Sequence, residues 1–292
     1  MSVPPSRSGS AAPLVARYDA VLLDLDGVVY LGDQPVPGAV EAIAEIRRID
    51  VRVSFVTNNA AHTPADVVER LGSQGIDATE DEVVTSSMAA AALLRDELPA
   101  GAAVLVVGGA GVWSAVAAAG LRPVVVAASD DMPLAVVQGW GPDVTWANLA
   151  EATVALRAGA RWVATNLDRT LPSPRGPLPG AGSLIAAVEA ATGRAPDTVA
   201  GKPFPALFSA AIERSGARHP LVIGDRLDTD IAGANNAGLP SMLVLTGVSR
   251  PRDVVAAPPE QRPTYIGTDL RSLFGDPHNV EYDVAVKTLD LS

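Results

Sequence analysis

The stretch of sequence that decides the fold is Val21-Leu22-Leu23-Asp24-Leu25-Asp26-Gly27-Val28-Val29-Tyr30. A short apolar run ends in two aspartates two positions apart, and a glycine follows them. The run predicts a buried strand, and Gly27 allows the chain to turn after it. Because open parallel sheets bind ligands beyond the carboxyl ends of their strands, Asp24 and Asp26 stand where a catalytic pair would lie. A turn stabilised by aspartate side chains explains both residues equally well, so the remaining chain must decide.

The composition limits the classes of protein to which the chain can belong. Its 292 residues are 48% hydrophobic and carry a formal net charge of −11, which argues against disorder and against general nucleic-acid binding. The absence of cysteine excludes disulfides, thiolate nucleophiles and cysteine-bound metals. Residues 1–16 lack the continuous apolar centre of a signal peptide and are expected to form a flexible arm. The uncharged segment 100–121 is interrupted by glycines, so we expect no membrane span and a cytoplasmic protein.

Short apolar runs alternate with helical patterns along the chain, which predicts parallel sheets and a doubly wound α/β fold. The segment 168–182 is rich in proline and glycine and is expected to be a long, ordered loop, and Ser86 or Ser87 is expected to cap a helix. Strands are expected at 21–23, 51–56, 83–85, 104–107, 123–127, 135–139, 162–165, 221–223 and 241–245, and helices at 38–48, 63–72, 86–98, 112–119, 146–158, 182–192, 205–215 and 231–237.

Four strand ends or loops carry polar residues that suit phosphoryl transfer. A carboxylate is a competent nucleophile toward phosphorus, and carboxylates also bind Mg²⁺. A hydroxyl, backbone N–H groups and an ammonium can hold the remaining phosphate oxygens. These residues are Asp24 and Asp26, then Thr57, Asn58 and Asn59, then Lys202, and finally Asp225 with Asp230.

With these residues in order, the chain resembles a haloacid dehalogenase (HAD) superfamily phosphatase. The four motifs are Asp-Leu-Asp-Gly-Val-Val-Tyr, Phe-Val-Thr-Asn-Asn, Gly-Lys-Pro and Gly-Asp-Arg-Leu-Asp-Thr-Asp-Ile. The interval between Thr57 and Lys202 has room for an inserted α/β cap, as in the C2-capped p-nitrophenylphosphatase, phosphoglycolate phosphatase and NagD-like branch. The resemblance implies a HAD-like Rossmannoid core at 17–97 and 198–275, a cap at 98–197 and a tail at 276–292.

Within that branch the last motif and Pro263-Thr264-Tyr265-Ile266-Gly267 most resemble actinobacterial glycerol-3-phosphate phosphatases. Some of those carry a further C-terminal domain, whereas this sequence ends at Ser292.

The resemblance also implies a role for each motif residue. Asp24 would attack phosphorus, and Asp26 would protonate the leaving oxygen and later activate water. Mg²⁺ would be held by Asp24, the Asp26 carbonyl and Asp225, with Asp230 acting through a water. Phosphate would be bound by Gly27, Thr57, Asn58, Asn59 and Lys202.

The cap is expected to choose the substrate, because phosphate and metal occupy the core motifs. The loop 166–176, stiffened by Pro172, Pro174 and the nearby Pro177, should reach the leaving group. The candidate specificity residues are Asn166, Asp168, Arg169 and Leu171. Glycerol 3-phosphate is the first choice by resemblance, followed by 2-phosphoglycolate, pyridoxal phosphate or a nucleotide, and a homodimer through the cap is expected.

Two rival interpretations remain open. Residues 104–114 form a predicted strand, glycine turn and helix, and Asp130 or Asp131 follows at the distance of a ribose ligand. Gly108–Gly111 would then bind a dinucleotide, although the glycines lack the full fingerprint spacing. The second rival is a non-catalytic binding protein of the same fold.

Overall fold

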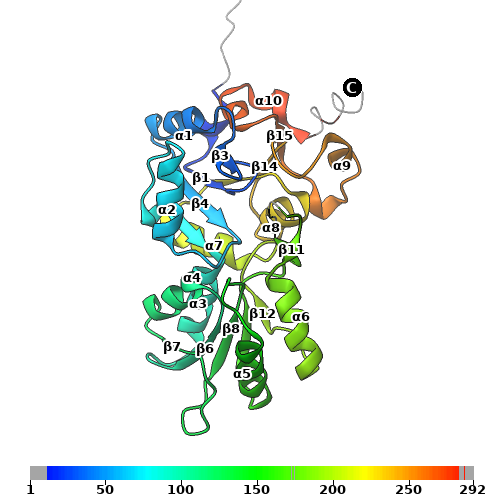
Figure 1. The fold of residues 1–292 in the computed structure, drawn as a ribbon. Helices are drawn as coiled ribbons and strands as arrows, with labels where there is room; N and C mark the ends of the chain where they lie inside the picture. Colours follow the sequence, from blue (N-terminus) through cyan, green and yellow to red (C-terminus); the bar gives the residue numbers. More distant parts are fainter. Residues whose placement is uncertain (1–11, 172, 174, 283–285, 287–292) are drawn as a thin grey trace, which may run out of the picture.

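The structure is a computed structural model that describes residues 12–171, 173, 175–282 and 286. It contains a six-stranded and a five-stranded parallel sheet, each flanked by helices, and the two form the upper and lower halves of Figure 1. No strand is shared between these sheets. The predicted α/β fold with an inserted cap is therefore confirmed.

The core sheet places β1 (Ala20–Leu23) between β13 (Pro220–Gly224) and β4 (Arg52–Thr57). All the neighbouring strands of this sheet run parallel, in the order β15-β14-β13-β1-β4-β5. The carboxyl ends of β1, β4 and β13 therefore lie at one edge, although their sequences are far apart. The other core strands are β5 (Val83–Thr85), β14 (Ser241–Val244) and β15 (Tyr265–Gly267).

Both faces of the core sheet are buried, as parallel sheets require. Val21 and Leu23 point to the face covered by α1 (Ala39–Arg48) and α2 (Pro64–Ser73). Leu22 points to the opposite face, which packs on α3 (Ser86–Glu97) and α7 (Ala206–Ser215). The alternation follows from the two-residue period of a strand and explains why the run is apolar throughout.

The cap sheet has the order β12-β9-β8-β6-β7 and its own helices. One of its faces packs on α4, and the other packs on α5 and α6. Its strands are β6 (Ala103–Val107), β7 (Arg122–Val124), β8 (Ala135–Gln138), β9 (Arg161–Ala164) and β12 (Thr198–Val199), and its helices are α4 (Ala110–Ala118), α5 (Trp146–Arg157) and α6 (Ala181–Thr192).

The remaining elements are short. Two hairpins are formed by β2 (Tyr30–Leu31) with β3 (Gln34–Pro35) and by β10 (Thr170–Leu171) with β11 (Leu178–Pro179). The short helices are η1 (Leu14–Arg17), η2 (Glu80–Glu82), η3 (Leu227–Ile231), α8 (Ala232–Asn236), α9 (Pro251–Val255), η4 (Pro259–Gln261), η5 (Leu270–Phe274) and α10 (Pro277–Val280). Of the residues that the structure describes, none belongs to a helix with the length and apolarity that crossing a bilayer requires.

Several boundaries differ from the sequence-based expectation. Leu14 and Val15, expected at the end of a flexible arm, lie in η1 and are fully buried against the core, whereas residues 1–11 lie outside the described part. The segment 168–182, expected to be a long, ordered loop, contains the β10–β11 hairpin. Thr198 and Val199 pair with β9, so the cap sheet extends two residues past the predicted boundary.

Smaller differences concern one helix cap and the chain end. The cap of α3 is Thr85, whose side chain accepts a hydrogen bond from Met88 N, and not Ser86 or Ser87. The predicted tail begins with the short helix α10, and Glu281 forms a β-bridge with Tyr265.

The cap and the core share one hydrophobic cluster. It joins core residues such as Leu22 and Phe208 to cap residues such as Val106 and Val163 through the alanine-rich helix α3. Phe208 of the core is 1% exposed and Val163 of the cap is 0% exposed, so the shared cluster excludes water. The two domains are therefore packed together as well as linked by the chain.

Candidate active site

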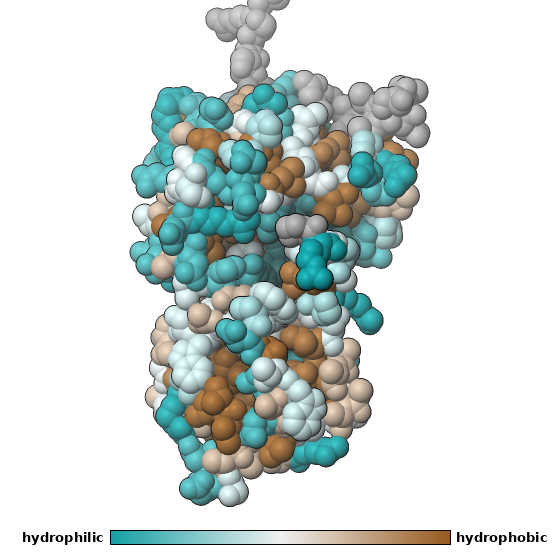
Figure 2. Space-filling model, in the orientation of Figure 1, coloured by the Kyte–Doolittle hydropathy of each residue, from teal (hydrophilic) through white to brown (hydrophobic). Residues whose placement is uncertain are grey.

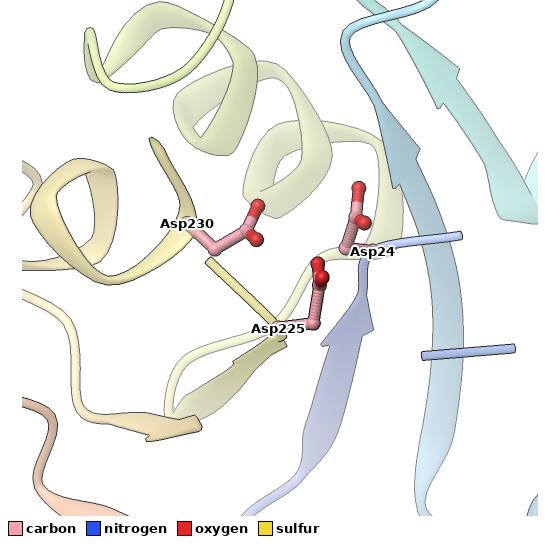
Figure 3. Close-up of side chains that lie close together, drawn as sticks. All are labelled: Asp24, Asp225 and Asp230. Carbon is pink, nitrogen blue, oxygen red and sulfur yellow. The ribbon is translucent and has the colours of Figure 1, made fainter. Parts of the chain in front are cut away.

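The predicted polar residues converge because of the strand order. Asp24 follows β1, Thr57 ends β4, and Asp225 follows β13, so three motifs meet at neighbouring strand ends. Asp230 reaches the same place from η3. Figure 3 shows the side chains of Asp24, Asp225 and Asp230 close together, and one oxygen of each lies within 4.8 Å of the others.

Lys202 neutralises part of this carboxylate cluster. Its Nζ lies 2.5 Å from Asp24 Oδ1 and 2.7 Å from Asp230 Oδ1, and it donates to Val56 O at 3.2 Å. The direct pair with Asp230 was not predicted from the sequence. Burial disfavours the ammonium of Lys202, but the charges of Asp230 and Asp24 outweigh it and raise the pKa of Lys202 above its ordinary value.

One ammonium cannot balance three clustered carboxylates, two of which are buried. Burial raises the pKa of Asp225 to about 6, and the charge of Asp230 adds to this effect. Burial also raises the pKa of Asp24 well above its ordinary value, with Lys202 opposing and Asp230 and Asp225 reinforcing the shift. The cluster therefore favours a further positive charge, either protons or a metal ion.

The donor set fits a hard divalent cation such as Mg²⁺. Asp225 Oδ1 is buried without a hydrogen-bond partner, while Oδ2 accepts from Val248 N at 2.6 Å. Such an orphaned oxygen is costly unless something binds it. Backbone encloses this carboxylate, because a Cβ on Gly27 would lie 2.5 Å from Oδ2 and one on Gly247 would lie closer still.

Gly27 makes the turn that directly follows Asp26. Its φ of +88° lies in the left-handed region, which glycine adopts without strain. Its N–H donates to Tyr30 O at 2.7 Å, and its carbonyl accepts from Thr246 Oγ1 at 2.5 Å. This turn fixes the backbone beside Asp26.

Asp26 itself stays accessible to solvent while protein surrounds it on most sides. Desolvation raises the pKa of its carboxyl group, and the charges of Arg70 and Lys202 oppose the shift. Arg70 was not predicted from the sequence. It stacks 4.2 Å from the Tyr30 ring centroid and donates to Gly32 O, and no local pattern links α2 to the first motif.

The loop after β4 is held by its own side chains. Thr57 Oγ1 accepts from Asn59 N at 3.1 Å, and Asn59 Oδ1 accepts from Ala61 N at 3.0 Å. Thr57 and Asn59 also line a cavity of about 510 Å³ that runs between Tyr30 and α2. Thr57 thus borders open space at the carboxyl end of β4.

The side chain of Asn58 does not face a free phosphate position. Its Oδ1 accepts from Lys202 N at 2.7 Å, and its Nδ2 donates to Lys202 O at 3.0 Å and to Asp168 Oδ2 at 3.3 Å. Its backbone carbonyl accepts from Ser86 and Asn166, so the backbone N–H remains for the predicted contact with phosphate.

The predicted specificity residues fall into two pairs. Asn166 and Asp168 lie at the junction of the two domains, where Asn166 Nδ2 donates to Asn58 O at 2.8 Å. Burial raises the pKa of Asp168, against the hydrogen bond from Asn58 and the charges of Arg226 and Lys202. Arg169 and Leu171 belong to the β10–β11 hairpin, with Arg169 exposed and Leu171 half-buried. Pro172 and Pro174 lie outside the described residues.

The glycine turn at residues 108–111 of the cap packs against the core backbone at residues 60–62. Gly111 N donates to Ala61 O at 2.9 Å, and a Cβ on Gly111 would collide with His62 O and Ala60 O. A Cβ on Gly109 would lie 2.9 Å from Ala61 O. These glycines let the cap approach the loop after β4, and no space is left there for the pyrophosphate of a dinucleotide. Figure 2 shows hydrophilic residues around the hollow between the two domains.

Comparisons with known proteins identify the family. A model described as haloacid dehalogenase-like hydrolase matches residues 21–122, and a HAD-hydrolase-like model matches residues 199–273. The chain belongs to the haloacid dehalogenase-like hydrolase family. Within that family it is a phosphatase, like its curated relatives.

The D-glycerol 3-phosphate phosphatase of Mycobacterium tuberculosis is 52% identical over 263 residues, which cover 90% of this chain and 73% of that protein. A crystal structure of glycerol phosphate phosphatase from M. tuberculosis in complex with magnesium has 50% identity and a TM-score of 0.88, covering 93% of this chain and 81% of that one. The 4-nitrophenylphosphatase of Thermotoga maritima is 33% identical with a TM-score of 0.81, covering 89% and 97%.

Proposed function

We propose that the chain is an Mg²⁺-dependent phosphomonoesterase that acts through an aspartyl phosphate and prefers glycerol 3-phosphate. The observation that carries this proposal is the cluster of Asp24, Asp225 and Asp230 around Lys202, with Asp225 Oδ1 left without a partner. Such a cluster combines a nucleophile with the means to hold a metal and a phosphate.

The chain's own residues provide both chemical steps. A carboxylate oxygen of Asp24 attacks phosphorus and the ester P–O bond breaks, while the Asp26 carboxyl group gives its proton to the leaving oxygen. In the second step Asp26 takes a proton from water, and the oxygen of that water displaces Asp24 from phosphorus. The raised pKa of Asp26 suits the first step, because the acid must be protonated when the alcohol leaves. Lys202 and Thr57 hold the phosphoryl oxygens.

Asp24, the Asp26 carbonyl and Asp225 would hold Mg²⁺, with Asp230 beside them. When bound, the ion neutralises phosphoryl oxygens and so lowers the electrostatic barrier to attack by an anionic carboxylate. Support comes from the excess of carboxylates over ammonium in the cluster and from the magnesium complex of the M. tuberculosis structure.

The choice of substrate rests on the M. tuberculosis relative and on the space around the site. The relative is named for D-glycerol 3-phosphate, and 2-phosphoglycolate, pyridoxal phosphate and nucleotides are the alternatives. The cavity lined by Thr57, Tyr30 and Arg70 offers room for a leaving group. Asp168, Arg169 and Leu171 would meet that group from the cap. One oxygen of Asp168 accepts a hydrogen bond from Asn58, and the buried Asn166 donates to Asn58 O.

A panel of small phosphomonoesters tests this proposal. Phosphate release should require Mg²⁺ and should give the highest kcat/KM with glycerol 3-phosphate. Equal rates in EDTA and in Mg²⁺ would refute the metal requirement. A higher kcat/KM with another ester would refute the substrate assignment alone.

We also propose a cytoplasmic homodimer that associates through the cap. Figure 2 shows hydrophobic residues gathered on the cap half of the molecule, and the exposed apolar side chains of the cap include Val125, Val126 and Leu134. Exposed apolar patches often mark contact surfaces. Sedimentation equilibrium tests this, since a monomer mass at micromolar concentration would refute it.

A further inference from the structure

Both polar groups of the Asn58 side-chain amide form hydrogen bonds with residues outside the loop after β4. The carbonyl oxygen accepts from Lys202 N at 2.7 Å, and the NH₂ group donates to Lys202 O at 3.0 Å. The same NH₂ group donates to Asp168 Oδ2 in the cap at 3.3 Å. One side chain therefore clamps the main chain of Lys202 at both polar groups and bonds the cap as well.

Asn58 is itself fixed from the opposite side. Its carbonyl accepts from Ser86 Oγ at 2.7 Å and from Asn166 Nδ2 at 2.8 Å. Gly201 allows the clamp to close, because a Cβ there would lie 2.6 Å from Asn58 Oδ1. The backbone of Asn58 is thus bonded from α3, while its side chain fits sterically against the loop before α7.

Lys202 needs such an anchor because its side chain is long. A lysine has four rotatable bonds, and its ammonium gives little directional guidance. Yet Nζ must lie 2.5 Å from Asp24 and 2.7 Å from Asp230 at once. Fixing the backbone of Lys202 fixes the position of its Cα, from which the side chain extends. The hydrogen bond from Nζ to Val56 O then orients the ammonium at the other end of the side chain.

We propose that Asn58 is a positioning residue, which sets the place of the Lys202 ammonium through the Lys202 main chain and ties that place to Asp168 of the cap. This inference rests on the role given to Lys202 in the proposed function. It differs from the expected use of Asn58 as a phosphate ligand, because the side chain acts on the enzyme and not on the substrate.

The test compares Asn58→Ala with Ser86→Ala. The control removes a hydrogen bond to the same residue but leaves the clamp on Lys202 intact. Asn58→Ala should lower kcat roughly 100-fold, since displacements near 1 Å can have such an effect. Ser86→Ala should keep the wild-type kcat, even though its Tm falls about as much as that of Asn58→Ala. If both variants lose kcat in proportion to their loss of Tm, Asn58 has only a structural role and the proposal is wrong.

A double variant shows whether Asn58 acts through Lys202. Once Lys202→Ala has removed the ammonium, adding Asn58→Ala should lower kcat no further, although Tm should still fall. Additive losses in kcat would mean that Asn58 acts on the substrate directly. If Lys202→Ala alone keeps the wild-type kcat, the proposed function fails at Lys202, which is a different result from failure at Asn58.

The bond to the cap has its own test. Asn58→Asp would place a carboxylate against Lys202 O and against Asp168, so kcat should fall. Adding Asp168→Asn supplies an NH₂ group to the new carboxylate and should recover part of kcat. No recovery would overturn the link between Asn58 and the cap.

Discussion

Replacement of Asp225 by asparagine should stabilise the metal-free protein while it abolishes the response to Mg²⁺. Asp225 is 1% exposed, and burial together with the charge of Asp230 raises its pKa to about 6. Asparagine keeps an oxygen for the hydrogen bond from Val248 N, and its NH₂ group faces two carboxylates instead of adding a third negative charge.

The magnitude follows from the pKa of Asp225. A folded value of about 6 against an ordinary 3.8 corresponds to about 3 kcal/mol, at roughly 1.4 kcal/mol per pKa unit. Below pH 3.8 the group is protonated in both states and has no effect. As pH rises from there to about 6 the unfolded state ionises first, so this group destabilises the fold, fully so above pH 6.

Thermal unfolding in EDTA between pH 4 and 7.5 measures this effect. At pH 7 the Asp225→Asn protein should unfold about 6–12 °C above the wild type, and near pH 4 the two should converge. Added Mg²⁺ should raise the Tm of the wild type and leave that of the variant unchanged. Asp19→Asn is the matched control, and this substitution should lower the Tm at pH 7 instead of raising it. Burial opposes ionisation of Asp19, but hydrogen bonds from Arg218 N and His219 N prevail and lower its pKa.

A lower Tm for Asp225→Asn than for the wild type in EDTA at pH 7 would refute this reasoning. It would mean that the carboxylate is already balanced inside the folded protein without a metal.

Three further outcomes are expected. Asp24→Asn should lose at least roughly 10⁴-fold in kcat at an unchanged fold, since it removes the nucleophile, and turnover through a covalent intermediate in that variant would contradict the assignment. Leu171→Ala should change kcat/KM for glycerol 3-phosphate far more than for p-nitrophenyl phosphate, and equal losses would indicate a role in stability instead. Gly111→Ala should cost about 1–3 kcal/mol in chemical denaturation, because its Cβ meets the core backbone, and an unchanged midpoint would show that the cap can shift freely.

The grouping of Asp24, Thr57 and Asp225 at neighbouring strand ends could be predicted from the sequence, because each strand end is a local pattern. A buried strand that ends in polar residues, as before Asp24 and Asp225, marks the carboxyl end of a parallel strand wherever it occurs. The strand order then brings these ends together, and any doubly wound sheet has such an edge. The direct contact between Lys202 and Asp230 was not readable, because it depends on how η3 is oriented relative to the loop before α7.

The missed elements lack a periodic signal. The β10 and β11 strands have two residues each and lie among prolines and glycines. They are too short to show the alternation of apolar and polar residues that predicts a strand. Leu14 and Val15 sit in a stretch rich in small and polar residues, and their burial comes from contacts with η5 near the other end of the chain. The clamp formed by Asn58 joins residues 144 positions apart, which no local pattern predicts.

Helix α3 has a consequence for domain grafting. Its alanines Ala89, Ala90 and Ala91 let the core sheet and α4 approach the same helix, and all three are buried in the shared cluster. The alanine side chains have no rotamers through which they could adjust. A larger side chain on the core sheet or on α4 would therefore have to displace the backbone. A cap transplanted from a relative would therefore need a matching α4 surface, or it would bring its own α3.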